Sequence, residues 1–451
     1  MIEFEPLYTA DEMRAAEARY PGTVDELMER AGSAVARIAL ELHRDLTRWT
    51  VVCGGGANGG DGRIAARALA RAGKEVRIVD AKAEETDLGD PEAILDALFG
   101  TGFAGEPRPA AAALIEAMNA AGVPLLAVDL PSGVDASTGE VAGPAVRATA
   151  SITFHGRKVG HVVAPGRFHA GAVHVVDIGL ERAETGIRAV TVDILRDVPR
   201  RREGDTKYTA GHVLVVGGSP GLTGAPSLAA MAAMRADAGY VTLAAPESTL
   251  PVFEQRLLEV VKRPLPDDLG ELAAKASSLA IGPGLGRGDG VRAFVRKALA
   301  EIELPAVVDA DALFGLEPGD WPAPRVLTPH EGEMAGLLGR DSKEVAAHRI
   351  ASVREAVERF DCVVLLKGQD TLVAAPGRGL LVCSLGLPSL ATAGTGDVLT
   401  GILGAFLAKG MDAHLAAAAA TAAQQRASVE APQRAGLIAS DLIETLPRVL
   451  R

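Results

Sequence analysis

Short apolar runs alternate with amphipathic segments through the first third of the chain. The β-rich run at residues 50–53 precedes a glycine cluster, and residues 63–72 then repeat apolar side chains at helical spacing. Further apolar runs follow at residues 75–80 and 124–129. A strand, a helix and a strand in this order predict a βαβ unit, and hence a parallel sheet with helices on both faces.

A second series of the same kind begins after residues 198–205, a charged stretch with Pro and Gly and no apolar periodicity. Strands are expected at residues 211–218, 240–244, 278–281, 306–309, 325–327 and 362–367. Helices are expected at residues 397–409 and 413–425. The pattern therefore predicts two α/β domains, 1–198 and 206–451, joined by a linker at 199–205. The first is expected to be a Rossmann-like three-layer α/β/α domain.

Composition narrows the class of protein. The chain has 451 residues, of which 48% are hydrophobic, and 46 basic against 58 acidic side chains give a formal charge of −12. That sign argues against a protein that coats nucleic acid or an anionic membrane. Three widely spaced cysteines predict neither a disulfide framework nor a zinc site. Short apolar stretches and an acidic start without a signal-peptide layout complete the expectation of a cytoplasmic protein.

The glycine cluster at residues 54–62 is the first candidate for chemistry. It contains the spacing G-x-G-x-x-G between a predicted strand and a predicted helix, and Asp80 ends the next strand. This order is typical of a dinucleotide-binding turn, in which the backbone approaches a pyrophosphate and the acid contacts a ribose. A tight strand-to-helix turn without a ligand is the alternative. Asp61 also places a carboxylate where a bound phosphate would be repelled, unless a cation or a substrate hydroxyl engages it.

Residues 393–399, with the sequence AGTGDVL, are the strongest motif in the chain. Gly394 and Gly396 allow backbone amides to converge on an anion at a helix start. Asp397 is then placed to accept a proton from a substrate hydroxyl while the amides hold a transferring phosphoryl group. A simple helix cap is the alternative. The motif resembles the anion hole and catalytic Asp of ribokinase-like small-molecule kinases.

Three segments of the first half, residues 58–62, 96–102 and 129–135, resemble in order the NAD(P)H-hydrate epimerase domain. The resemblance runs over about residues 1–198. It implies that the substrate contacts Asn58, Gly59, Gly60, Asp61, Gly100, Thr101, Gly102, Phe103, Ala104, Gly105, Glu106 and Asp129. It also implies a potassium ion held by Asn58, Asp96 and Ser132, whose oxygen atoms suit a hard cation. Ala57 stands where the family usually has a further Asn.

Asp129 precedes a Pro-Ser-Gly turn at the end of a predicted parallel strand. Ligand sites of α/β folds form at that end of a sheet. We expect Asp129 to move a proton during epimerisation, with a turn-forming role as the alternative.

The second half resembles one branch of the ribokinase-like superfamily, the ADP/ATP-dependent NAD(P)H-hydrate dehydratase. The segments that carry the resemblance are residues 207–212, 217–219, 224–226, 282–286, 309–313, 328–333, 367–368 and 393–399. It implies a ribokinase-like α/β fold over residues 206–451. It implies that the hydrated nucleotide contacts Ala225, Gly284, Gly286, His330 and Asp397. It implies that the adenine nucleotide contacts Lys367, Gly368, Gln369, Asp370, Thr371, Gly394, Thr395 and Gly396.

Two further residues of this half have open roles. Glu333 matches a glutamate that sugar kinases use around magnesium, with an exposed helix carboxylate as the alternative. His330 suits a ligand contact or a structural role. Phe314 departs from the family, which usually has a polar residue there.

Together the two halves imply one repair activity. Hydrated NADH and NADPH (NADHX and NADPHX) exist as R and S epimers; the first domain would interconvert them, and the second would dehydrate the S form with ADP or ATP and Mg²⁺. The alternative enzyme is a hydroxymethylpyrimidine- or sugar-type kinase with an NAD-binding accessory domain. A non-catalytic NAD sensor is a third reading, against which Asp397 in its glycine frame argues. A homo-oligomer stays open, and neither nucleic acid nor membrane is expected as a partner.

Overall fold

The computed structural model describes residues 4–81, 86–433 and 435–451; the first three residues of the acidic start lie outside this range. Contacts divide the chain into an N-terminal unit, Pro6–Ile187, and a C-terminal unit, Arg188–Arg451 with Met1–Glu5.

The division falls before the expected boundary at residue 198. Strand β8 (Ile187–Ala189) and the 3₁₀ helix η4 (Val192–Asp197) belong to the large sheet and the core of the C-terminal unit. The charged stretch that was expected to link the domains is also part of the C-terminal unit. Lys409 Nζ donates to the Pro199 carbonyl at 3.2 Å, and Arg201 pairs with Asp237 at 2.7 Å.

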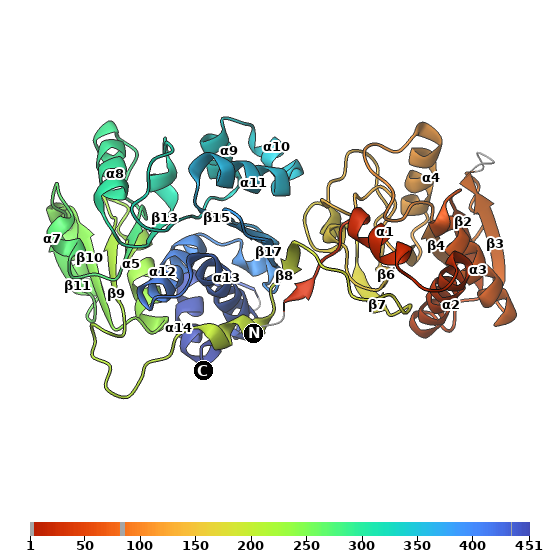
Figure 1. Ribbon diagram of the computed structural model, residues 1–451, viewed down its shortest axis with the longest axis horizontal. Coiled ribbons are helices and arrows are strands. Elements are labelled where there is room, and N and C mark those ends of the chain that lie inside the picture. Colours follow the sequence, from red (N-terminus) through yellow and green to blue (C-terminus); the bar gives the residue numbers. More distant parts are fainter. Residues whose placement is uncertain (1–3, 82–85, 434) are drawn as a thin grey trace. The chain divides into compact units, whose positions relative to one another are not determined.

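The N-terminal unit is built on a parallel sheet in the order β3-β2-β4-β5-β6-β7. Its strands are β2 (Arg48–Cys53), β3 (Glu75–Asp80), β4 (Ala93–Ala97), β5 (Leu125–Val128), β6 (Ala150–Phe154) and β7 (Ala172–Val176). Its helices are α1 (Ala10–Ala18), α2 (Val24–Leu42), α3 (Ala57–Arg71) and α4 (Pro109–Ala120), with short 3₁₀ helices η2 (Val159–His161) and η3 (Gly166–Phe168). Helices α1 to α3 share one apolar core with the sheet, while α4 shares a second core with it. The expected three-layer α/β/α arrangement is confirmed (Figure 1).

Helix α3 begins six residues before the expected helix. Its first turn is the glycine cluster itself, in which Gly59 packs against backbone where a side chain has no room, whereas Gly60 faces the flexible end of Met28. A Cβ on Gly59 would lie 2.0 Å from the Gly54 carbonyl oxygen, and one on Gly60 would lie 2.1 Å from Met28 Cε.

The C-terminal unit contains a larger sheet in the order β1-β8-β17-β16-β15-β14-β13-β12-β9-β10-β11. Its strands are β1 (Glu5–Pro6), β8, β9 (His212–Val216), β10 (Tyr240–Ala245), β11 (Val261–Pro264), β12 (Ser278–Ile281), β13 (Ala306–Val308), β14 (Arg325–Leu327), β15 (Val363–Leu366), β16 (Thr371–Ala374) and β17 (Leu380–Cys383). The strands from β11 to β15 along this order pair in parallel, and β15, β16 and β17 pair antiparallel.

The helices of this unit are α5 (Gly224–Arg235), α6 (Leu250–Arg256), α7 (Gly270–Ala273), α8 (Asp289–Glu301), α9 (Glu331–Leu338), α10 (Ser342–Ala347), α11 (Arg349–Phe360), α12 (Thr395–Ala408), α13 (Ala413–Glu430) and α14 (Ala439–Val449). Short 3₁₀ helices are η4, η5 (Glu247–Thr249), η6 (Ala310–Leu313) and η7 (Pro388–Leu390). Helices α5, α12, α13 and α14 share one buried core with the sheet. Figure 1 shows α8, α9 and α11 on the opposite face. The two expected C-terminal helices are therefore confirmed as a buried layer.

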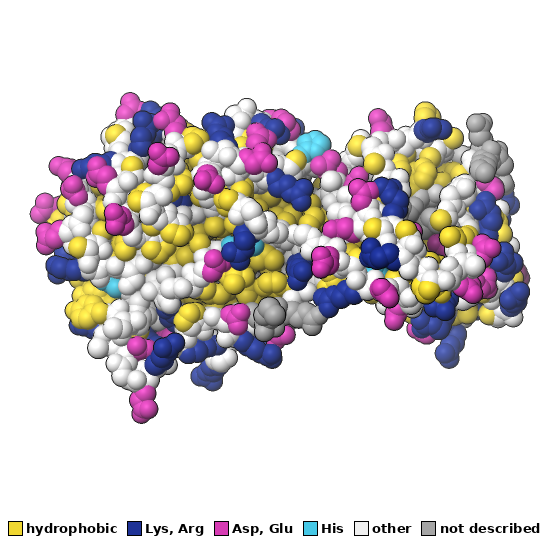
Figure 2. Space-filling view, in the orientation of Figure 1, with side chains coloured by type: hydrophobic (Ala, Val, Ile, Leu, Met, Phe, Trp, Pro, Cys, Tyr) yellow, Lys and Arg dark blue, Asp and Glu magenta, His cyan; other side chains and the backbone are white. Residues whose placement is uncertain are grey.

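Acidic and basic side chains interleave over the face of the molecule shown in Figure 2. Cys53, Cys362 and Cys383 are all buried free thiols. Among the described residues, no helix combines the length and apolarity needed to cross a bilayer.

Candidate active sites

A cavity of about 940 Å³ lies at the carboxyl ends of the strands in the N-terminal unit. The expected residues that line it are Asn58, Asp61, Gly100, Thr101, Gly102, Phe103, Ala104, Glu106 and Asp129. Gly59, Gly60 and Gly105 are not part of this lining. Gly59 is needed for the packing of α3 described above, so its glycine identity has a structural cause that the sequence pattern did not separate from ligand binding.

Asp129 follows β5 with a φ of +66°, a left-handed backbone that a non-glycine residue rarely adopts. Its Oδ1 accepts hydrogen bonds from Lys158 Nζ at 2.7 Å and Thr153 Oγ1 at 2.8 Å. Burial alone would raise the pKa of Asp129, but the charge and hydrogen bonds of Lys158 outweigh it and lower that pKa below its usual value. Asp129 is therefore an ionised carboxylate that lines the cavity.

Lys158 is the buried partner of Asp129 and was not expected from the sequence. Its side chain is only 1% exposed, and its ammonium group also donates to Thr153 Oγ1 and the Phe154 carbonyl. Buried lysines are rare without a partner. Lys158 stands four residues after β6 in a polar stretch, so its sequence context gave no sign of burial.

His161 holds the same segment from the other side. The Lys158 backbone N–H donates to His161 Nδ1 at 3.0 Å, so the ring hydrogen is on Nε2, which donates to the Asp129 carbonyl at 2.8 Å. Burial, and then the Lys158 charge, lower the pKa of His161 to about 4. A neutral imidazole thus anchors the Asp129 backbone.

Asp61 contributes a second carboxyl group to this cavity from α3. It is 8% exposed, and its Oδ1 has no hydrogen-bond partner among the described residues. Burial raises its pKa to about 8, with further contributions from the charges of Asp129 and Glu17. Asp61 is therefore protonated at neutral pH in this cavity.

The three expected cation ligands meet around the backbone of Phe99. Ser132 Oγ donates to Asp96 Oδ1 at 2.6 Å and accepts from the Phe99 N–H at 2.9 Å, while Asn58 Nδ2 donates to the Phe99 carbonyl at 2.8 Å. Asp96 is fully buried, and burial raises its pKa to about 6 in spite of the hydrogen bonds from Ser132 and Leu98. The structure thus brings Asn58, which lines the cavity, together with Asp96 and Ser132, which are not part of its lining.

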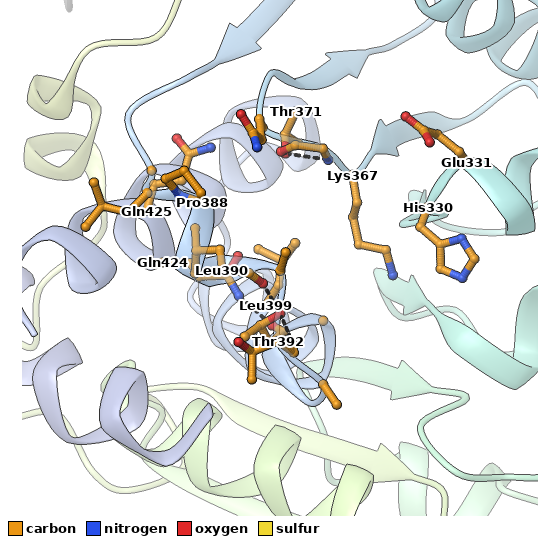
Figure 3. Close-up of a pocket in the computed structure, with 18 of the residues that line it drawn as sticks. His330, Glu331, Lys367, Thr371, Pro388, Leu390, Thr392, Leu399, Gln424 and Gln425 are labelled. Atoms are coloured by element: carbon orange, nitrogen blue, oxygen red, sulfur yellow. Dashed lines mark hydrogen bonds between the residues drawn. The ribbon is translucent and has the colours of Figure 1, made fainter. Parts of the chain in front are cut away.

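The C-terminal unit has its own cavity of about 760 Å³ (Figure 3). The expected residues that line it are His330, Lys367, Gly368, Gln369, Thr371, Thr395 and Gly396. Residues that the sequence reasoning missed include Glu331, Pro388, Thr392, Gln424 and Gln425. The glutamines come from the middle of α13, a helix that reads as buried core, so their access to a cavity depends on tertiary packing. Gln424 Nε2 donates to the Thr395 carbonyl and ties α13 to the motif.

Asp397 is the third residue of α12, which begins directly after Gly394, whose φ of +87° favours a residue without a side chain. The N-cap residue of α12 is Gly394, so no side chain caps the helix, and neither Gly394 nor Asp397 is among the residues that line the 760 Å³ cavity. Burial raises the pKa of Asp397 to about 7, and the negative charges of Asp309, Asp311 and Glu333 add to this effect while Lys367 opposes it. Such a carboxyl group exchanges protons near neutral pH.

Lys367, which follows β15, contacts one acidic residue after β13 and another in α9. Its ammonium group contacts Asp309 Oδ1 at 2.8 Å and Glu333 Oε2 at 3.5 Å, and Asp309 Oδ2 accepts from Thr400 Oγ1 at 2.6 Å. Burial would lower the pKa of Lys367, but Asp309 and Glu333 outweigh it and raise that pKa. A Cβ on Gly396 would lie 3.5 Å from Lys367 Nζ. The cation therefore stands beside the glycine frame, and Figure 3 shows its side chain extending into the space beside His330.

His330 caps α9, because its Nδ1 accepts hydrogen bonds from the backbone amides of Gly332 and Glu333 at 3.0 and 3.3 Å. Its side chain is exposed and lines the cavity, so the capping role leaves part of the ring accessible from the cavity. Glu333 is not a freely solvated helix carboxylate, since its side chain is 14% exposed and contacts Lys367.

The remaining expected residues lie elsewhere in the unit. Asp370 is buried, and its carboxylate pairs with Arg349 at 3.1 Å behind the cavity lining. Ala225 is in the first turn of α5 after β9, and Gly284 and Gly286 follow β12 with φ of +62° and +90°. These three are at the carboxyl edge of the sheet, outside the lining of the 760 Å³ cavity.

Comparison with known proteins covers both units. The family model described as NAD(P)H-hydrate dehydratase matches residues 213–448, and the model of the YjeF-related protein N-terminus matches residues 24–88 and 79–160. The chain is 36% identical to the bifunctional NAD(P)H-hydrate repair enzyme Nnr of Moorella thermoacetica, over 98% of this chain and 94% of that protein. It is 33% identical to the enzyme of that name from Escherichia coli K12, over 98% and 94% of the two chains.

Solved structures resemble the C-terminal unit. The ADP/ATP-dependent NAD(P)H-hydrate dehydratase of Bacillus subtilis, co-crystallised with ATP/Mg²⁺, is 28% identical, with a TM-score of 0.53 over 57% of this chain and 96% of that chain. A ribokinase-like superfamily protein of Enterococcus faecalis V583, 21% identical, shares the fold with a TM-score of 0.53 over 60% and 97% of the chains. The expected ribokinase-like fold is confirmed. With two matching family models and full-length relatives of this identity, the chain belongs to the family of bifunctional NAD(P)H-hydrate repair enzymes.

Proposed function

We propose that this protein repairs hydrated NADH and NADPH, interconverting their R and S epimers in the N-terminal unit and dehydrating the S form in the C-terminal unit with ADP or ATP. The observation that carries the proposal is the likeness to Nnr enzymes along 98% of the chain, with a cavity in each unit beside the residues expected to act there. AMP or ADP and phosphate are the expected by-products.

Dehydration of the S form needs a better leaving group than hydroxide. Transfer of a phosphoryl group to the hydroxyl on ring carbon C6 supplies one, and phosphate then leaves with the help of the electron pair on the ring nitrogen. A kinase-like site can therefore serve a lyase. The protein's tasks are to remove the hydroxyl proton and to stabilise charge on the phosphoryl group.

Asp397 fits the first task. Its pKa of about 7 leaves a substantial ionised fraction at neutral pH, so it accepts the hydroxyl proton. The backbone amides at the start of α12 fit the second task, because a helix start carries unsatisfied N–H groups and favours negative charge. Lys367 adds a fixed positive charge beside Gly396.

Magnesium would accompany the nucleotide and neutralise its phosphate charge when bound. The site offers carboxylate oxygen in Glu333, the ligand type that magnesium takes together with phosphate oxygens. Lys367, Gly368, Gln369 and Thr371 line the same cavity and are the residues we assign to the nucleotide.

Epimerisation needs a group that moves protons at the C6 hydroxyl, and Asp129 is the ionised carboxylate of the N-terminal cavity. The Asn58, Asp96 and Ser132 cluster fits a potassium ion. Its donors are oxygen atoms, and no ion pair compensates the fully buried Asp96 among the described residues. A bound monovalent cation would offset that buried charge.

Product analysis tests the proposal. The purified chain, given R and S hydrates separately with ADP or ATP and Mg²⁺, should return reduced cofactor and free phosphate from both. A small-molecule kinase would leave a stable phosphoester instead, and consumption of the S form alone would remove the epimerase half.

A further inference from the structure

The N-terminal cavity contains carboxyl groups with very unequal surroundings. The buried ammonium group of Lys158 lies 2.7 Å from the Asp129 carboxylate. In the described part of this unit, no other buried ammonium group lies within hydrogen-bond distance of a carboxylate of this cavity. Asp61, in the same cavity, is almost fully buried with an unpartnered Oδ1. The single ammonium group of Lys158 cannot stabilise two buried carboxylates. Asp129, which pairs with Lys158, is therefore the ionised one, and Asp61 keeps its proton.

We propose that Asp61 and Asp129 form a proton-donor and proton-acceptor pair, in which Asp129 removes the proton of the C6 hydroxyl and Asp61 protonates the ring nitrogen N1. This inference rests on the proposed epimerase function. It assigns Asp61 a catalytic role in addition to contact with the substrate.

The chemistry balances with these two groups alone. C6 of the hydrate carries both the hydroxyl oxygen and N1. When Asp129 takes the hydroxyl proton, the C6–O bond becomes a carbonyl, the C6–N1 bond breaks with its electrons moving to N1, and Asp61 delivers its proton there. Rotation about C5–C6 presents the other carbonyl face. The ring closes as the other epimer when N1 attacks C6, N1 returns its proton to Asp61, and Asp129 returns its proton to the oxygen. No net redox change takes place.

The fold supplies the two groups from neighbouring segments of one sheet edge. Asp61 is on α3, which follows β2, and Asp129 follows β5; β4 pairs with both of these strands. The carboxyl ends of parallel strands meet at one edge, so both side chains line one cavity. His161 and Lys158 hold Asp129, and Asp61 on α3 lies near enough for the charge of Asp129 to contribute to its raised pKa.

Other charged groups around this cavity do not replace Asp61. Glu17 on α1 and Glu106 and Arg108 before α4 also line it. Glu17 is exposed at the rim, and its pKa is raised by partial burial and by the charge of Asp129. The pKa of Asp61, about 8, and the lowered pKa of Asp129 give a window in which one is protonated and the other ionised. Epimerisation should therefore fall as pH rises through about 8.

The test uses the full chain and pure R epimer, with R and S separated by chromatography and spontaneous conversion subtracted. Asp61→Asn should slow epimerisation on the order of 10²- to 10⁴-fold and abolish the alkaline limb near pH 8. Asp45→Asn, which removes an exposed carboxyl group outside the cavity lining, should stay within about threefold of the unchanged chain, since surface substitutions have small effects. Dehydration of pure S epimer measures the amount of active C-terminal unit in each preparation, and the fluorescence of the buried Trp49 in a Trp321→Phe background reports that the N-terminal unit is folded.

Asp61→Asn with near-normal epimerisation would overturn the pair, and so would a variant that is slow but keeps the alkaline limb. If the variant does not fold, the unchanged chain still decides the question, because a rate that stays flat through pH 8 and above contradicts a donor at Asp61. Failure of the unchanged chain to convert R epimer at any pH would instead refute the proposed epimerase function.

Discussion

The buried ion pair between Lys158 and Asp129 makes Lys158→Met a sharp test of how the first site is held together. The substitution keeps an unbranched side chain of similar length but removes the ammonium group. Asp129 then loses its 2.7 Å partner, and Thr153 Oγ1 and the Phe154 carbonyl each lose a donor. Breaking a buried pair from one side costs about 3–5 kcal/mol, because the remaining charge stays in a poorly solvated place.

The cost should depend on pH in a defined direction. In the unchanged chain the pKa of Asp129 is lowered, so its stabilising contribution is present above the unfolded pKa and is lost as pH falls. In the variant, burial without Lys158 raises that pKa, so protonation relieves the charge at low pH and the penalty grows as pH rises. The loss of unfolding free energy should therefore be larger at pH 7 than at pH 5.

Urea unfolding measures this loss. The chain has two tryptophans, Trp49 in the N-terminal unit and Trp321 in the C-terminal unit. In a Trp321→Phe background the fluorescence of Trp49, which is 1% exposed, reports the N-terminal unit alone. Lys74→Met is the matched control, since Lys74 donates to the Arg44 carbonyl at the protein surface. Its effect should stay below about 1 kcal/mol.

The double variant Lys158→Met/Asp129→Asn removes both charges and should unfold less easily than Lys158→Met alone. A penalty for Lys158→Met below about 1 kcal/mol at pH 7 would refute the reasoning. A penalty of equal size at pH 5 and pH 7 would show that lost packing, rather than an uncompensated carboxylate, destabilises the variant.

Three further outcomes are expected. Asp397→Asn should lower dehydration of the S epimer on the order of 10²- to 10⁴-fold while epimerisation continues, and near-normal recovery of reduced-cofactor absorbance by the variant would contradict the base assignment. In the unchanged chain the dehydration rate should rise with pH through about 7 as Asp397 ionises. Asp129→Asn should do the converse, leaving R epimer to persist beyond its spontaneous conversion, and rapid consumption of both epimers would remove Asp129 from the mechanism. Crystals soaked with thallium, a potassium substitute, should show an anomalous peak touching Asn58, Asp96 and Ser132, whereas ordinary water at that place would speak against the cation.

Much of the fold was predictable because local pattern encodes it. The strand at residues 278–281 and the helices after Asp397 and Ala413 are where apolar spacing placed them. The domain boundary was predicted too late, because the charged stretch after residue 198 looks like a linker while its backbone and Arg201 bind the C-terminal unit. Charge and the lack of periodicity indicate exposure, and they do not tell which core an exposed segment borders.

The candidate sites likewise combine features that the sequence predicts with features that only the folded chain decides. The sequence by itself determined the glycine frame around Asp397 and the turn after Asp129, since backbone freedom and residue order are local properties. Tertiary structure alone decided that Lys158, twenty-nine positions after Asp129, becomes its buried partner, because β5 and β6 pair in parallel and their carboxyl ends meet at one edge. It also decided that Gln424 reaches a cavity from a helix that reads as core. Side-chain partnerships and burial depend on sheet register and helix packing, and these arise only when distant segments come together.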